Sequence, residues 1–298
     1  MSDLTKNVEA FLRACRAKRL SPATVEWYEW LLSEYHDYVE THGLRWDDPD
    51  TLDAFLGEHL AQREISTHTV HAHYRALRRF FNWLEKRQRL PHTNPILVVE
   101  PPRLPHRLPR NIEASKVEKL LITTRGSTWM DKRDRAIILF LWDTGVRADE
   151  LCSLEMRDLD LVHRTALIRN GKGRKDRIVP FGLRAKEALE SWLEIRSERA
   201  RCDHVFVNRS GKPFTRRGLQ SMLRRRQKEA GVSGPCNPHA FRHGFAVAYL
   251  DNGGSIHNLQ RLMGHATLRS TEVYLQSTDK RVRADHAKAS PGDHLRIE

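Results

Sequence analysis

The sequence predicts a mainly α protein with a small antiparallel sheet, an α+β fold arranged in two domains. Apolar residues recur at helical spacing through most of the 298 residues, and one short β-branched stretch surrounds a glycine-containing turn. A proline-rich segment separates the two parts, and each part is long enough to bury its own core. The chain has no run of about 18 apolar residues, and charges interrupt its first stretch, so we expect a cytoplasmic protein without a membrane span or signal peptide.

Residues 1–97 are predicted to form an all-helical domain. Ser21 is a cap candidate for a helix that has Pro22 in its first turn and stops at Gly43. The expected helices of this domain cover residues 21–43, 48–64 and 66–90.

The third of these helices has a basic side that lies largely off its apolar stripe. This side could follow a phosphate backbone, and a solvated helix face is an equal alternative. The candidate DNA contacts on it are His73, Arg75, Arg78 and Arg79.

Residues 98–110 are predicted to form an extended, basic linker, because the prolines from Pro91 to Pro109 leave no helical period. Arg103 and Arg107 are its candidate DNA contacts. Residues 111–298 then form the second domain, with a C-terminal tail from about residue 280.

The second domain is predicted to be helical around a small sheet. A hairpin fits residues 165–182, where two β-branched runs flank the turn at 170–176, and 203–208 fits one more strand. The expected helices cover residues 115–124, 131–145, 146–154, about 215–230, 238–252 and 255–263.

The basic charge is concentrated in the later part of the chain. Residues 1–100 carry 13 basic and 15 acidic side chains, whereas residues 101–298 carry 38 and 23, so the formal charge of +13 arises entirely after residue 100. Such an excess favours a polyanionic partner, most simply nucleic acid, although a solvated face or an anionic membrane surface would also fit.

Several polar residues stand in segments that otherwise look like core. His239 and Arg242 share the first turn of an apolar helix, and a buried guanidinium should meet an acid or face a cleft. Arg147 starts a helix, where it could bind an anion or pair with Glu150. Cys236 lies three residues before His239, but two ligands do not make a metal site, and a packed free thiol is favoured.

Three further candidates complete the set. Lys172 occupies the predicted hairpin turn, with Arg174, Lys175 and Arg177 as candidate phosphate contacts nearby. His265 follows a helix stop at Gly264, and Tyr274, which alone would pass for a core residue, lies nine residues later. Together, two arginines, a lysine, two histidines and a tyrosine could perform phosphoryl transfer without a metal, and the sequence has no nucleotide-binding glycine-lysine loop.

These motifs closely resemble those of the tyrosine recombinases, the phage-integrase and Xer-like site-specific recombinases, over nearly the whole chain. "TGVRADEL" resembles the first arginine box, "GKGRKDRIVP" the hairpin lysine box, "HAFRHGFA" the His-x-x-Arg box, and "LMGHATLRSTEVY" the Leu-Gly-His box with its tyrosine. The catalytic residues implied by this match are Arg147, Lys172, His239, Arg242, His265 and Tyr274. His243 has a common counterpart, which we interpret as structural. The chain departs from the common pattern at Gly244, at Met263 and in "YLQ" after residue 273, which bears on the subfamily rather than on activity.

The resemblance implies a core-binding domain at 1–97, a catalytic domain at 111–298, and cleavage of DNA through a 3′-phosphotyrosyl link without metal, ATP or other cofactor. Tyr274 would attack the phosphodiester, His239 would accept its proton, and Lys172 would protonate the 5′-oxygen. Arg147 and Arg242 would bind the non-bridging oxygens, with a hydrogen bond from His265.

The partner implied is a double-stranded recombination site, held by a homotetramer on two duplexes that is a monomer or weak dimer when free. A second recombinase or an accessory protein is a further candidate partner, and the tail is either exchanged between subunits or disordered. The biological task would be resolution of chromosome or plasmid dimers, or integration and excision of a mobile element. The alternatives are relaxation of DNA like a type IB topoisomerase, and a non-catalytic DNA-binding regulator with the same fold.

Overall fold

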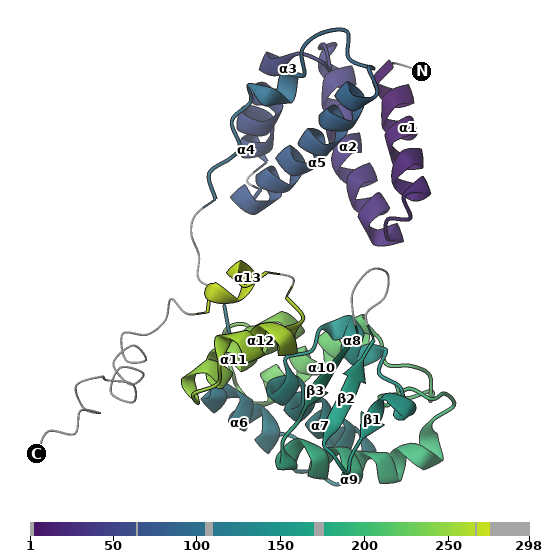
Figure 1. The fold of residues 1–298 in the computed structure, drawn as a ribbon, viewed down its shortest axis with the longest axis vertical. Helices are drawn as coiled ribbons and strands as arrows, with labels where there is room; N and C mark the ends of the chain where they lie inside the picture. Colours follow the sequence, from purple (N-terminus) through teal and green to yellow (C-terminus); the bar gives the residue numbers. More distant parts are fainter. Residues whose placement is uncertain (1–2, 64, 105–109, 170–175, 266, 275–298) are drawn as a thin grey trace, which may run out of the picture. The chain divides into compact units, whose positions relative to one another are not determined.

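The computed structural model describes residues 3–63, 65–104, 110–169, 176–265 and 267–274, and its contacts divide the chain into Met1–Arg107 and Leu108–Glu298 (Figure 1). Each unit has its own buried core. The arrangement is mostly helical with one small sheet, so the predicted α+β class is confirmed. Among the described residues, no helix is long and apolar enough to cross a bilayer.

The N-terminal unit consists of helices only. The predicted helix at 21–43 is confirmed, since the Ser21 side chain accepts a hydrogen bond from the Thr24 amide and Gly43 ends the helix with a φ of +62°. The first helix of this unit was not among the predicted helices. The elements are α1 (Asp3–Ala17), α2 (Pro22–His42), α3 (Pro49–Asp53), the π-helical turn η1 (Ala54–His59), α4 (Leu60–Gln62), α5 (Thr67–Lys86) and the 3-10 turn η2 (Pro95–Leu97).

Aromatic side chains fill the core between α1, α2 and α5. The ring of Phe11 on α1 meets Tyr28 on α2 and Phe80 on α5 edge-on, with centroids 5.3 and 5.5 Å apart. Ile96 and Val99 are buried in the same core, so the chain packs on the N-terminal unit as far as residue 99.

The prediction that His73 contacts DNA is wrong, because its side chain is fully buried in this core. Its ring packs against Trp30 and Phe55, and its Nε2 lies 3.2 Å from the Glu34 carboxylate. Helical spacing placed His73 beside the stripe, but the stripe is wide enough to include it. The other three candidates on α5, namely Arg75, Arg78 and Arg79, are exposed.

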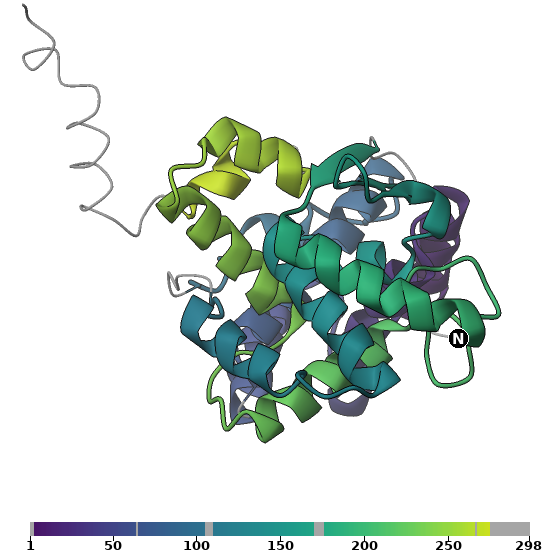
Figure 2. The ribbon, with the colours of Figure 1, turned by 90° about the horizontal axis from the view of Figure 1, so that it is seen from below.

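The C-terminal unit combines helices, seen from below in Figure 2, with a three-stranded sheet. Its elements are α6 (Ala114–Ile122), α7 (Trp129–Thr144), α8 (Ala148–Cys152), the 3-10 turn η3 (Met156–Asp158), β1 (Leu159–Asp160), β2 (Thr165–Ile168), β3 (Arg177–Pro180), α9 (Leu183–Arg199), α10 (Arg216–Glu229), α11 (Pro238–Asp251), α12 (Ile256–Met263) and α13 (Arg269–Glu272). The expected helices are confirmed, and α9, which the sequence analysis did not identify, lies along α7.

The sheet is antiparallel in the order β1-β2-β3, and Ala166 on β2 stands opposite Val179 on β3. The two predicted hairpin strands are therefore confirmed. The turn between them, with Lys172, Arg174 and Lys175, lies outside the described residues, as does Arg107 in the linker. The predicted strand at 203–208 is wrong: this segment forms only isolated bridges, from His204 to Glu155 and from Val207 to Pro213.

Helix α7 forms the centre of the second core, with Ile137, Ile138 and Phe140 fully buried. Helix α11 packs closely on it at Gly244, where an added Cβ would lie 2.6 Å from both the Ile112 carbonyl and the Trp142 ring. The absence of a side chain at residue 244 therefore lets α11 approach α7, and this explains the departure at Gly244 from the common family pattern.

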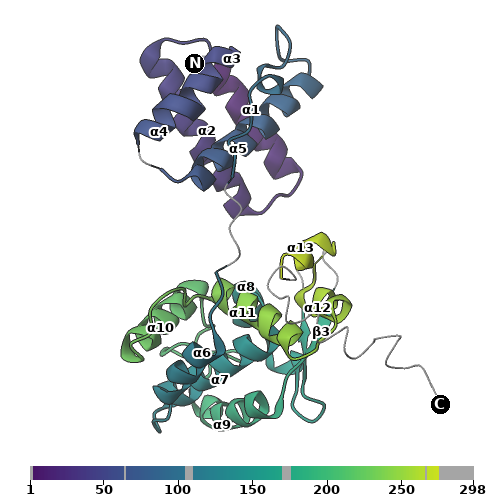
Figure 3. The same ribbon diagram turned by 90° about the vertical axis from the view of Figure 1, so that its left-hand side faces the viewer.

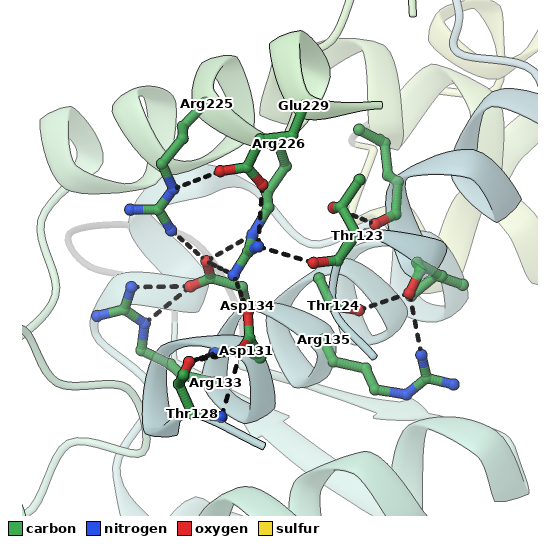
Figure 4. A network of polar contacts seen from close by, with 12 residues as sticks. Thr123, Thr124, Thr128, Asp131, Arg133, Asp134, Arg135, Arg225, Arg226 and Glu229 are labelled. Atoms are coloured by element: carbon green, nitrogen blue, oxygen red, sulfur yellow. Dashed lines mark hydrogen bonds and ion pairs between the residues drawn. The ribbon is translucent and has the colours of Figure 1, made fainter. Parts of the chain in front are cut away.

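A buried polar network joins α7 to α10 (Figure 4). The Asp134 carboxylate, with no exposed surface, accepts hydrogen bonds from Arg133, Arg225 and Arg226. Arg226 also donates to Asp131 at 2.8 Å. Because each charge has an opposite partner, burial of the network costs less than burial of an isolated ion.

Candidate active site

Arg242 lies near the start of α11 and is 4% exposed. The Asn237 side chain caps this helix by accepting a hydrogen bond from the Ala240 amide. The guanidinium donates two hydrogen bonds of 2.6 Å, to the carbonyls of Gly145 and Met263. Both carbonyls belong to C-terminal helix ends, those of α7 and α12, where the helix dipole favours a cation. Arg242 therefore links α11 to the ends of α7 and α12, and these three helices are labelled in Figure 3.

The surroundings of Arg242 lower its pKa to about 10. Burial is the main cause, and repulsion by Arg147 adds to it, while Glu150 opposes the shift. The side chain remains charged at neutral pH. A cation that is buried, and repelled by a second cation, gains stability when an anion binds beside it.

Glu150 organises the second arginine. Its carboxylate accepts the Arg147 amide and guanidinium, both at 2.8 Å, so the salt bridge considered in the sequence analysis is present. It also accepts a two-pronged contact from Arg177 on β3 at 2.9 and 2.7 Å. Burial would raise the pKa of Glu150, but the hydrogen bonds from Arg177 and Arg147 outweigh it and lower this pKa to about 2. The carboxylate is therefore ionised throughout the neutral range.

The prediction that the Arg177 side chain contacts phosphate from the hairpin surface is wrong. That side chain points inward, where its Nε donates to the Leu262 carbonyl at 2.7 Å and its two terminal nitrogens meet Glu150. Arg177 thus ties β3 to α8 and α12. This link could not be predicted from the sequence, because it joins residues that lie far apart in the chain.

The local charge is positive. Arg147 and Arg177 both bind the Glu150 carboxylate, and both repel the charge of Arg242, which Glu150 attracts. Arg147 is the most accessible of the three, with 28% of its side chain exposed. Such a group of fixed guanidinium donors suits the non-bridging oxygens of a phosphodiester.

Tyr274 is brought to the same place by the segment that follows α13. It is 5% exposed and packs with Phe245 and Leu250 of α11. Its hydroxyl lies 2.6 Å from Nδ1 of His243. Burial raises its pKa, and the positive charge of Arg242 opposes this rise.

His243, which the sequence led us to interpret as structural, contacts the Tyr274 hydroxyl in the structure. Burial lowers its pKa to about 4, and the charges of His239 and Arg242 add to the effect, so the ring is neutral at pH 7. His239, the predicted proton acceptor, is exposed one helical turn earlier, with its ring centroid 5.3 Å from that of His243.

His265 follows the end of α12 at Gly264, as predicted, and its Nδ1 lies 2.9 Å from the Thr271 hydroxyl. Burial lowers its pKa to about 4, and the nearby Arg242 and Arg147 add to this shift. In the neutral ring, Nδ1 contacts Thr271, and the other nitrogen, Nε2, can form a second hydrogen bond.

Cys236 behaves as the packed thiol that the sequence favoured. Its sulfur lies 3.8 Å from the Leu223 carbonyl, and burial raises its pKa to about 11. Metal ligation requires the thiolate, which this environment disfavours.

Comparison with known proteins defines the class to which this fold and site belong. The phage integrase family model matches residues 110–281, more than half of the chain. The chain therefore belongs to the phage integrase family, and it is a Xer-like tyrosine recombinase, a site-specific DNA recombinase. It is 34% identical over 302 residues to tyrosine recombinase XerD of Listeria monocytogenes, covering 98% of this chain and 99% of that protein. It is 32% identical to XerC of Bacillus licheniformis, covering 93% of each.

Solved structures share the fold. The XerH recombinase in a post-cleavage complex with palindromic difH substrate matches with a TM-score of 0.75 and 22% identity, covering 95% of this chain and 84% of that one. The Tn1549 transposon integrase with a circular intermediate DNA matches with a TM-score of 0.76 and 19% identity, covering 95% and 99%.

Proposed function

We propose that this recombinase cuts and rejoins DNA through a 3′-phosphotyrosyl link at Tyr274. The observation that carries the proposal is the contact of the Tyr274 hydroxyl with His243 on the same helix as buried Arg242. The covalent link would retain the energy of the phosphodiester, so rejoining would need no ATP. Fixed arginines would balance the charge that a metal ion balances in other phosphoryl-transfer enzymes.

The roles follow from the position of each group. Arg147 and Arg242 would bind the non-bridging oxygens, because fixed acceptors hold both guanidinium groups in place. His265 would add a hydrogen bond from the ring nitrogen that does not meet Thr271. Lys172 would protonate the leaving 5′-oxygen, and a histidine of α11 would accept the proton of Tyr274, whose hydroxyl contacts His243.

The proposed substrate is a double-stranded recombination site, bound by four copies of the chain on two duplexes in the cytoplasm. The excess of basic residues after residue 100 supports a nucleic-acid partner. XerH and the Tn1549 integrase were solved with DNA substrates, which fits the same proposal. The exposed Arg75, Arg78, Arg79 and Arg103 would contact phosphates, as would Arg107, Arg174 and Lys175. The proposed biological task is resolution of chromosome or plasmid dimers, or integration and excision of a mobile element.

The experiment that tests the nucleophile uses a nicked suicide substrate that traps the covalent intermediate. Tyr274→Phe should bind this DNA with wild-type affinity and form no adduct. Adduct formation by Tyr274→Phe at the wild-type level would refute the assignment.

The role of Lys172 has a separate test. A 5′-bridging phosphorothiolate has a sulfur leaving group that needs no proton, so it should restore cleavage by Lys172→Ala. A Lys172→Ala variant that stays inactive on this substrate would contradict the role of general acid.

Of the two alternatives, one shares this chemistry and the other shares only the fold. A type IB topoisomerase-like enzyme would relax a supercoiled plasmid without a second site, whereas the proposed enzyme requires two sites. A non-catalytic regulator would form no adduct at all. A two-site recombination assay run beside plasmid relaxation separates all three.

A further inference from the structure

The contact between His243 and Tyr274 has a chemical consequence beyond holding the tyrosine. The hydroxyl oxygen lies 2.6 Å from the ring nitrogen Nδ1, which is within the range expected between a general base and the oxygen whose proton it removes. Both residues are shielded from water, with Tyr274 5% exposed and His243 part-buried, so solvent competes poorly for this proton.

We propose that His243 is the proton acceptor for Tyr274 in strand cleavage, in the place that the sequence analysis gave to His239. The proposal rests on Tyr274 being the nucleophile.

The bonds and protons of the step balance. As the tyrosine oxygen forms its bond to phosphorus, the O–H bond of Tyr274 breaks and its proton moves to Nδ1 of His243. The bond from phosphorus to the 5′-oxygen breaks, and that oxygen takes a proton from the general acid, for which Lys172 is proposed. In rejoining, the 5′-hydroxyl attacks the phosphotyrosyl group and gives its proton back to the proposed general acid Lys172, while His243 returns its proton to the leaving tyrosine oxygen.

His239 is less suited to this step in the observed arrangement. It stands four residues before His243 on α11, it is exposed, and its ring packs against that of His243. In the reacting complex, the nitrogen of the base lies about 2.6–3.2 Å from the oxygen whose proton it removes. His239 would reach Tyr274 only if the tyrosine left His243. From the helix start, His239 remains able to contact the phosphate.

The charges around His243 make its basicity depend on bound DNA. Burial, His239 and Arg242 all disfavour a proton on its ring in the free protein. A phosphodiester held by Arg147 and Arg242 would add a negative charge that offsets this repulsion. His243 would thus become a competent base only when the substrate is present, and the tyrosine would stay protonated until then.

The test compares His243→Asn with His239→Asn in single-turnover cleavage of the suicide substrate. The asparagine amide can accept the hydrogen bond that Nδ1 accepts, but it does not take up a proton at neutral pH. His243→Asn should bind DNA normally and cleave about 10²-fold more slowly or worse. Cleavage by His243→Asn at the wild-type rate would overturn the proposal. His243→Gln serves if the first variant fails to fold.

A second measurement separates proton transfer from positioning. Replacing Tyr274 by a fluorinated tyrosine lowers the pKa of the phenol, so less help from a base is needed. The defect of His243→Asn should then shrink at least several-fold, whereas that of His239→Asn should not. An unchanged defect would make His243 a positioning residue only and refute its role as acceptor.

The phosphorothiolate substrate distinguishes base from acid. It should leave the His243→Asn defect in place, and rescue would show that His243 acts on the leaving group instead. Tyr274→Phe is measured alongside. If Tyr274→Phe still forms the adduct, the proposed nucleophile fails; if it forms none while His243→Asn cleaves normally, only the assignment of His243 fails.

Discussion

Replacing Glu150 with glutamine tests the account of the arginine cluster. Glu150 accepts four hydrogen bonds, two from Arg147 and two from Arg177, on its two carboxylate oxygens. A glutamine has one carbonyl oxygen, so its amide nitrogen would face donors that now meet a carboxylate oxygen. The variant would also leave the neighbouring guanidinium groups without their shared counter-charge.

The expected cost follows from the pKa of Glu150. The folded protein lowers this pKa from 4.5 to about 2, which corresponds to about 3 kcal/mol of stability. This agrees with the range of about 3–5 kcal/mol for breaking a buried ion pair. For a unit of this size, a loss of about 3 kcal/mol lowers the melting temperature by about 6–12 °C.

The assay is thermal unfolding of the full chain, with Glu190→Gln as the matched control. Glu190 forms an exposed pair with Lys186 at 3.5 Å, so its loss should cost about 0.5 kcal/mol or less. Because the folded pKa of Glu150 is depressed, its contribution is complete above about pH 4.5 and is lost as the pH falls toward about 2. The difference between wild type and Glu150→Gln should therefore be constant from about pH 5 to 8. Equal melting of the two variants would refute the reasoning.

Two more substitutions test the packing that supports the site. Gly244→Thr should destabilise the catalytic unit by about 1–3 kcal/mol and slow cleavage, because its Cβ would collide with the Ile112 carbonyl and the Trp142 ring; unchanged urea unfolding would contradict this. Asp134→Asn removes the charge that Arg226 and its neighbours share, so urea unfolding should show a loss of about 3–5 kcal/mol while DNA binding of the folded protein is unchanged. A loss below about 1 kcal/mol would mean that the network carries little stability.

The sequence was informative where local rules decide the structure. Ser21 and Gly43 marked the ends of α2, and Gly145 and Gly264 marked the ends of α7 and α12. These signals depend on backbone conformation within one turn, so neighbouring residues suffice to predict them.

The sequence failed where packing decides. The segment 203–208 has strand-like residues, but it pairs only at isolated bridges, and its apolar side chains are buried in a helical core. His73 is polar, yet the core of the N-terminal unit encloses it beside Glu34. Secondary-structure propensity and side-chain polarity are properties of single residues, so neither predicts these tertiary surroundings.

In the active site, too, the local motifs could be predicted from the sequence and the long-range contacts could not. The motifs supplied Arg147, Arg242, His265 and Tyr274, and the structure brings these residues into one region of the C-terminal unit. His243 meets a tyrosine 31 positions later in the chain, a contact created by the way the segment after α12 folds back on α11.

Arg177 likewise reaches Glu150 across 27 positions. Periodicity within one helix or strand contains no information about such pairs, so sequence reasoning treated His243 as structural and Arg177 as an exposed contact.

The most direct test of the central claim is to identify the residue that carries the DNA. Wild-type protein is trapped on the suicide substrate, digested, and the peptide that holds the nucleotide is located by mass spectrometry. We predict a single phosphotyrosyl adduct on Tyr274, absent from Tyr274→Phe. An adduct on another residue, or one that persists in Tyr274→Phe, would contradict the account.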